Sequence, residues 1–246
     1  MADSLGPIPP LRRTGDEPLH LHGDEHGTLL GFWAWAYSSL AGNTLRGALA
    51  EYIVALALGA AQGTRVDWDS VDLRLPDGST VEVKSAAYMQ EWAQTRRSTI
   101  TFSIAPAEGW DPLTAESAPE RIRRADVYVF CLLHHDDKPT LDPLDLSQWT
   151  FHVLPTRVLD AYAPTQRTIA LSTLLTLNPV RTDYAGLREA ILTATATGTG
   201  TGTGTGTTAA DGRPSPPSQG IQPPAHPRVV HLPRMRQPDT EGFLHE

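Results

Sequence analysis

Two acidic residues and a lysine lie close together in the sequence with a spacing suited to hydrolysis. Asp72 precedes the triplet Glu82-Val83-Lys84. Paired carboxylates bind hard divalent cations such as Mg²⁺ through their oxygens. A water on such a cation can attack a phosphodiester, because the metal lowers the pKa of the water and neutralises charge on the phosphate. A nearby lysine can orient or deprotonate this water, or stabilise the transition state. These residues therefore predict metal-assisted hydrolysis of phosphodiesters.

The lysine is informative because the chain favours arginine. Of its 20 basic residues only Lys84 and Lys138 are lysines. A compact ammonium with a tunable pKa differs chemically from a guanidinium. We therefore interpret Lys84 as a residue kept for its chemistry.

Residues 71–85 are predicted to form the β-hairpin that positions these side chains. Apolar residues alternate with polar ones on both sides of Pro76-Asp77-Gly78, as in two half-buried strands. Pro-Asp-Gly suits a three-residue loop with glycine in the left-handed position. Such a loop pairs Leu75 with Ser79 and puts Asp72 opposite Glu82. One face of the hairpin then carries the charged side chains, which are Asp72, Arg74, Glu82 and Lys84.

A helix is predicted upstream of the hairpin, over residues 45–61. Asn43 is a suitable cap, and apolar residues recur at helical spacing after it. Arg46 and Glu51 are the only charged residues of this helix. Since an ionised glutamate in an apolar helix needs a partner, Glu51 either completes a metal site or pairs structurally with Arg46 or Lys84.

Together these features resemble the PD-(D/E)xK nuclease superfamily, which has the restriction-endonuclease-like fold. The resemblance covers residues 43–155 and its motif is short; Asp72 follows valine instead of the proline of the motif. It implies that Mg²⁺, with Mn²⁺ as an expected substitute, is held by the side chains of Asp72, Glu82 and Glu51 and by the Val83 carbonyl. It further implies that Lys84 serves the attacking water.

The remaining pattern predicts an α/β fold in which helices flank a central mixed β-sheet. We expect a third antiparallel strand at 98–104 and a crossover helix at 116–124. A central strand buried on both faces is expected at 125–133, because the sequence there is continuously apolar. A last strand follows at 149–154, with further helices at 157–162 and 184–192. This order matches a restriction-endonuclease-like core (αβββαβ), here with disordered termini.

Three parts of the chain are expected. Residues 1–27 are predicted to be a flexible N-terminal arm, and residues 28–192 a nuclease-like domain. Residues 193–246 are predicted to form a disordered tail rich in Thr and Gly, then in Pro. The aromatic run at 28–40 is expected to pack on the core, with base stacking as the alternative. Residues 227–236 could dock a protein partner.

The net charge of −8 argues against a generic nucleic-acid coat, so a DNA-facing cleft must be locally basic. Candidates for DNA contacts lie near the catalytic strand or in the segment after it: Arg46, Ser85, Gln90, Gln94, Arg96 and Arg97. Arg121, Arg123 and Arg124 are further basic candidates. The single cysteine, Cys131, and the lack of a membrane-spanning stretch predict a cytoplasmic protein that is not bound to membranes.

The sequence therefore predicts a Mg²⁺-dependent hydrolase, a DNA endonuclease. RNA remains an open substrate, because the metal-assisted chemistry does not require a deoxy sugar. Cutting both strands would favour a homodimer. Nothing in the sequence selects among restriction, repair, recombination and mobile-element roles. The alternative is a catalytically silent nuclease-like domain that binds nucleic acid or protein.

Overall fold

The computed structural model describes residues 8–65, 69–111 and 116–196, with side chains outside 110–119. All of them belong to the unit that spans Met1–Thr203. Most of the predicted tail, residues 197–246, lies outside the described residues. No helix within the described ranges is long and apolar enough to cross a membrane.

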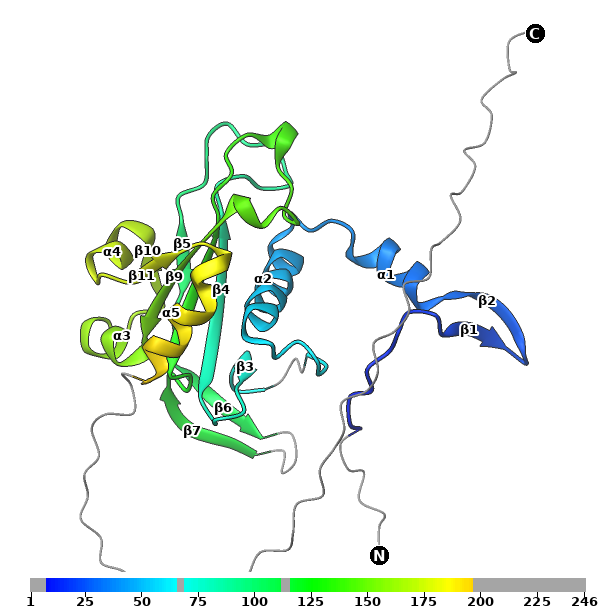
Figure 1. Ribbon diagram of the computed structural model, residues 1–246, viewed down its shortest axis with the longest axis horizontal. Helices are drawn as coiled ribbons and strands as arrows, with labels where there is room; N and C mark the ends of the chain where they lie inside the picture. The colour runs from blue at the N-terminus through cyan, green and yellow to red at the C-terminus, as the bar shows by residue number, and fades with distance from the viewer. Residues whose placement is uncertain (1–7, 66–68, 112–115, 197–246) are drawn as a thin grey trace, which may run out of the picture. The chain divides into compact units, whose positions relative to one another are not determined.

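A mixed five-stranded sheet forms the centre of the fold, in the strand order β11-β9-β8-β4-β3 (Figure 1). Strands β4 and β8 run parallel, and the other neighbours are antiparallel. All seven residues of β8 are buried, as its continuous apolar sequence predicts for a central strand. The bounds are β3 Leu73–Arg74, β4 Thr80–Ala87, β8 Val127–Leu133, β9 Trp149–Pro155 and β11 Val180–Thr182.

Two helices, α2 (Asn43–Leu58) and α5 (Tyr184–Ala196), cover one face of this sheet (Figure 1). They pack on the odd-numbered residues of β4, β8 and β9, which point to that face because side chains alternate along a strand. The even-numbered residues of β8 pack on the other side against α3 (Thr156–Tyr162), α4 (Leu171–Thr176), β5 (Thr101–Ser103) and β10 (Thr168–Ala170). The predicted α/β architecture with a central mixed sheet is confirmed.

The other elements lie outside the central sheet. They are the hairpin of β1 (Pro18–Leu21) and β2 (Asp24–Thr28), helix α1 (Leu29–Tyr37), the hairpin of β6 (Ala107–Asp111) and β7 (Glu116–Ile122), and the short 3₁₀ helices η1 (Lys138–Thr140) and η2 (Leu146–Gln148). Regular structure therefore begins earlier than expected, because residues 18–28 already form a hairpin.

The predicted hairpin register is confirmed. Leu73 pairs with Val81, and Leu75 N donates to Ser79 O at 2.8 Å, which puts Asp72 opposite Glu82. Gly78 has φ +87°, the left-handed conformation that the Pro-Asp-Gly loop requires. The turn thus sets which side chains face each other across the two strands.

Strand β4 continues to Ala87, and an irregular loop follows it. Two predictions for the later segments are wrong. The strand at 101–103 pairs with β10 instead of β4. Residues 116–122 form strand β7 in place of the crossover helix. Pro119 explains this last difference, since proline breaks helices but is accepted near an irregularity such as the register shift opposite Ala107–Gly109.

The aromatic run at 28–40 does form a short helix, but its expected packing on the core is wrong. Thr28 caps α1 by accepting a hydrogen bond from Gly31 N at 3.1 Å. None of the residues of α1 is buried, and Trp35 is 86% exposed. The apolar side chains of this segment therefore do not form part of the core of the sheet.

Candidate active site

Asp72, Glu82 and Lys84 form one charged cluster at the edge of the sheet. The Lys84 Nζ atom lies 2.5 Å from Glu82 Oε1 and 3.9 Å from Asp72 Oδ2. Glu82 and Lys84 share a face of β4 because they are two residues apart. About a fifth to a quarter of each of the three side chains is exposed, so the cluster is accessible to a ligand.

The short edge strand explains the position of Asp72. Strand β3 has only two residues and begins directly after Asp72. Val83 N donates a hydrogen bond of 2.6 Å to Asp72 Oδ2. In an antiparallel ladder, the N–H and C=O of one residue point to the same neighbouring strand. The Val83 carbonyl therefore points toward the same edge as Asp72. This is the direction that a backbone ligand to a shared cation needs.

Asp72 carries its negative charge at an energetic cost. Its pKa is raised from 3.8 to about 6, chiefly by burial and then by the Glu82 carboxylate. Lys84 and the Val83 N–H oppose the increase, and Glu51 adds to it. A bound cation would therefore stabilise the ionised form of Asp72 more than that of a carboxylate whose pKa is not raised.

Lys84 stays protonated at neutral pH in this arrangement. Burial acts to lower the pKa of its ammonium group, but the carboxylates of Glu82, Asp72 and Glu51 together raise it above its usual value. The side chain is therefore suited to donate hydrogen bonds and to stabilise negative charge.

Glu51 reaches the site from helix α2, and its partner is Arg65. The Arg65 Nε atom lies 2.5 Å from Glu51 Oε2, and Arg65 Nη2 lies 3.1 Å from Glu51 Oε1. Arg46 and Lys84, the partners considered from the sequence, make no such bond with it among the described contacts. Glu51 is close enough to Asp72 and Lys84 to raise the pKa of both.

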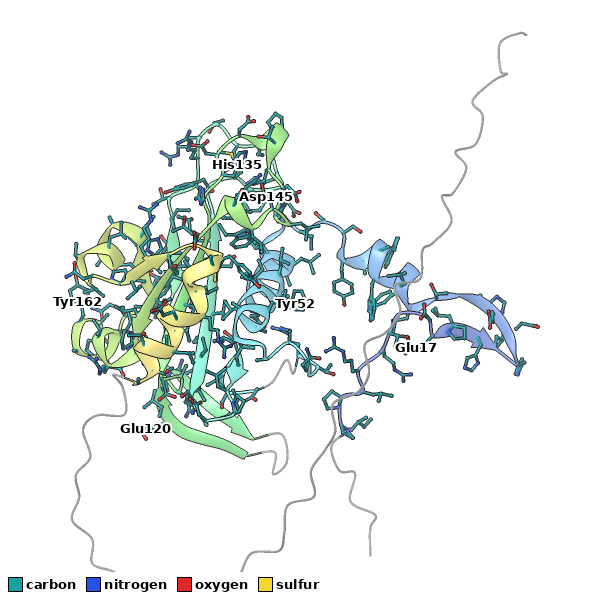
Figure 2. All side chains as sticks on the ribbon, in the orientation of Figure 1. Glu17, Tyr52, Glu120, His135, Asp145 and Tyr162 are labelled. Atoms are coloured by element: carbon teal, nitrogen blue, oxygen red, sulfur yellow. The ribbon has the colours of Figure 1, made fainter. Side chains whose placement is uncertain are left out.

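A cleft of about 680 Å³ lies beside this cluster and contains Glu51 and Asp72 in its wall. Tyr52 of α2, labelled in Figure 2, also lines it. The basic residues of the lining are Arg12, Arg13, Arg65 and Arg74. Glu82 and Lys84 do not line the cleft, because they point to the opposite face of β4 from α2; Asp72 connects the two groups.

The sequence interpretation missed the basic residues that the N-terminal segment contributes. Arg12 Nη1 donates to the carbonyl oxygens of Ala61 and Gly63, both at 2.8 Å, and so fixes this segment to the loop after α2. The adjacent pair Arg12-Arg13 was the available signal. It could not be placed, because a segment without periodicity gives no register against the sheet.

Three of the predicted DNA contacts instead form a structural network. Arg46 is only 3% exposed and Gln90 is 8% exposed. The Arg46 guanidinium donates to Asn43 Oδ1 at 2.6 Å, Ala41 O at 2.9 Å and Ser85 Oγ at 3.2 Å. These bonds fix the start of α2 to β4. Arg46 Nη1 also donates to Gln90 Oε1 at 3.5 Å, so Arg46, Ser85 and Gln90 all have a role in the fold.

The remaining basic and polar candidates make their contacts outside the carboxylate cluster. Gln94 accepts a hydrogen bond from Gln90 N at 2.6 Å and so organises the loop after β4. Arg96 and Arg97 are exposed, and Arg97 pairs with Asp136. Arg123 is buried and forms an ion pair with Asp160 at 2.6 Å. Arg121 pairs with Glu108, and Arg124 donates to carbonyl oxygens of its own hairpin.

The donor atoms suit a hard cation, although two basic side chains now engage them. Among the described residues, no group of three or more His, Cys, Asp or Glu side chains is arranged to hold a metal ion. Lys84 contacts Glu82, and Arg65 contacts both oxygens of Glu51. The set still consists of carboxylate and carbonyl oxygens, which fits Mg²⁺ or Mn²⁺. The raised pKa of Asp72 agrees with such a fit.

Comparisons of the chain with family models, with curated proteins and with solved structures each found no match.

Proposed function

We propose that this chain is a metal-dependent nuclease that hydrolyses phosphodiester bonds in DNA, with a site of the PD-(D/E)xK type. One observation carries the proposal: Asp72 faces Glu82 across a tight hairpin, and Lys84 Nζ lies 2.5 Å from Glu82 and 3.9 Å from Asp72. A surface ion pair alone would not require the partly buried, high-pKa carboxylate that Asp72 provides.

We also propose a restriction-endonuclease-like core made of α2, β3, β4, β8 and β9. The parallel pairing of β4 with β8 supports it, as does the position of α2 on one face of the sheet. The core departs from the expected order in two ways. Strand β5 lies outside the central sheet, and the β6–β7 hairpin stands in the crossover between β4 and β8.

The side chains of Asp72, Glu82 and Glu51 and the carbonyl of Val83 would hold Mg²⁺ or Mn²⁺, which supplies an activated water and neutralises charge on the phosphate. Glu51 must release Arg65 for this, and Glu82 must release Lys84. Arg65 is 48% exposed, so its side chain has room to move toward solvent.

Lys84 acts as a donor in this proposal. Since its pKa is raised, the ammonium group keeps its proton at neutral pH. It can hold the attacking water by a hydrogen bond, or donate to a phosphate oxygen as negative charge develops there. This favours transition-state stabilisation over deprotonation of the water.

The test is incubation of the purified chain with single- and double-stranded DNA in Mg²⁺, Mn²⁺ or EDTA. Lys84→Ala is the diagnostic variant, and Lys138→Ala is its matched control because Lys138 is the only other lysine. We expect metal-dependent cutting that Lys84→Ala abolishes and Lys138→Ala preserves. Cutting that persists in Lys84→Ala would contradict the assigned site.

One observation favours a second function, a silent nuclease-like domain that binds nucleic acid. Lys84 and Arg65 already compensate the charges of Glu82 and Glu51, so the cluster is stable as an ion-pair network. Binding of DNA without cutting in any of the metal conditions would support this alternative. A Lys84→Ala variant that then loses stability but not DNA affinity would identify the network as structural.

A further inference from the structure

The N-terminal segment, residues 11–17, is built into one wall of the cleft. Leu30 N donates to Gly15 O at 2.8 Å and Leu29 N donates to Glu17 O at 2.9 Å, which joins the segment to α1. Arg12 joins it to the loop after α2. Gly15 has φ +102°, and a Cβ there would lie 3.1 Å from the Trp33 ring. The segment is therefore held at both ends.

The cleft is basic in a protein that is acidic as a whole. Its lining contains four arginines and three carboxylates, whereas the chain carries a net charge of −8. Arg12 bonds to carbonyl oxygens, so its charge is not compensated by a carboxylate in those bonds. A locally positive cleft in an acidic protein attracts phosphates.

Helix α1 adds an aromatic surface next to this cleft. Trp33 lines the cleft, and Tyr37 lies one turn further on the same side of the helix. Tyr37 is 49% exposed and makes an edge contact with Phe32, with ring centroids 5.7 Å apart. Aromatic side chains beside arginines are the usual platform for stacking unpaired bases.

The size of the cleft also favours a single strand. About 680 Å³ is the volume of a pocket that encloses a small organic ligand, which corresponds to a nucleotide or two. A duplex presents paired bases that cannot stack on Tyr37 without being opened.

We propose that the cleft takes single-stranded nucleic acid, with phosphates beside Arg12 and Arg13 and bases stacked on Trp33 and Tyr37. This inference rests on the proposed function of the adjoining carboxylate cluster, whose substrate class it names. It assigns Arg12, Arg13, Trp33 and Tyr37 to substrate binding.

The test measures binding of the full chain to a fluorescent single strand of about 15 nucleotides and to the matching duplex, by anisotropy in EDTA. We expect the single strand to bind at least about tenfold more tightly. Tyr37→Ala should weaken single-strand binding about 5- to 100-fold and leave duplex binding unchanged. Arg13→Ala should reduce the salt dependence of single-strand affinity by a log–log slope of about 0.7.

Two variants serve as matched controls, with folding checked by circular dichroism. Trp35→Ala removes a more exposed aromatic from the opposite side of α1, and Arg157→Ala removes an exposed arginine from α3, on the far face of the sheet. Neither should change affinity. Equal binding of single strand and duplex would overturn the inference, and so would a loss caused by Trp35→Ala instead of Tyr37→Ala.

The outcomes separate this inference from the proposed function. Metal-dependent cutting without single-strand preference retains the nuclease and rejects the inference. Tyr37-dependent binding of single strands without cutting retains the inference and rejects catalysis. Failure to bind any nucleic acid rejects both.

Discussion

Replacing Asp72 by asparagine should stabilise the folded protein near neutral pH. The pKa of Asp72 is raised by about two units, from 3.8 to about 6, mainly by burial and by Glu82. Each unit corresponds to about 1.4 kcal/mol, so the ionised carboxylate costs the fold up to about 3 kcal/mol. This cost already includes the attraction of Lys84, and asparagine keeps an oxygen to accept the Val83 N–H bond. We expect a gain of up to about 3 kcal/mol.

The sign of the pH dependence follows from the raised pKa. The folded state holds the Asp72 proton more tightly than the unfolded state does. The contribution of Asp72 to the stability of the parent is therefore most favourable below about pH 4, falls as the pH rises to about 6, and carries the full cost above that. The asparagine variant lacks this loss, so the two proteins should differ at about pH 7.5 and agree near pH 4.

Urea unfolding of both proteins at the two pH values measures the effect. Asp69→Asn is a matched control from the same cleft. The pKa of Asp69 is lowered, because Arg74 and backbone N–H groups outweigh its burial. Its replacement should give no gain. A loss of stability in Asp72→Asn at about pH 7.5 would refute the reasoning, since it would mean that attraction to Lys84 exceeds the cost of burial.

Three other predictions follow from named contacts. Arg46→Ala should lower the free energy of unfolding by about 3 kcal/mol, measured in urea, because it leaves buried acceptors unpaired; unchanged stability would contradict a structural Arg46. Glu51→Gln should weaken Mg²⁺ binding and Arg65→Gln should strengthen it, read from the shift of the unfolding midpoint with added Mg²⁺; equal shifts would exclude competition between Arg65 and the metal. Removal of residues 198–246 should preserve stability in thermal unfolding, whereas removal of 193–246 should lower it, because Ala194 and Thr195 of α5 are buried; equal stability of the two truncations would contradict this.

The hairpin could be predicted in detail because local chemistry determines it. Pro-Asp-Gly fixes the loop length and the left-handed glycine, and the loop length fixes which residues face each other. Asp72 opposite Glu82 follows from that register without any tertiary information. The buried strand β8 was predictable for a similar reason, since few other elements have seven consecutive apolar residues.

Pairings between distant segments could not be predicted. Strand β5 alternates as an ordinary strand would, but nothing in that alternation distinguishes β10 from β4 as its neighbour. Arg65 lies after α2 in a stretch without periodicity, so its bond to Glu51 has no local signal. Arg46 resembled a surface cation because its acceptors, Ala41, Asn43 and Ser85, come together only in the folded chain.

The instability of Asp72 and the proposed metal binding are two consequences of one arrangement. Burial and the approach of Glu82 raise the free energy of the ionised carboxylate, and a divalent cation would lower it again. Stabilisation by Mg²⁺ should therefore be largest where the carboxylate is fully ionised, above about pH 6, and should vanish near pH 4. Unfolding midpoints measured with and without Mg²⁺ across this range check the point in the parent and in Asp72→Asn. Equal stabilisation of the two proteins by Mg²⁺ would mean that the cation binds elsewhere, and the carboxylate cluster would then be an ion-pair network only.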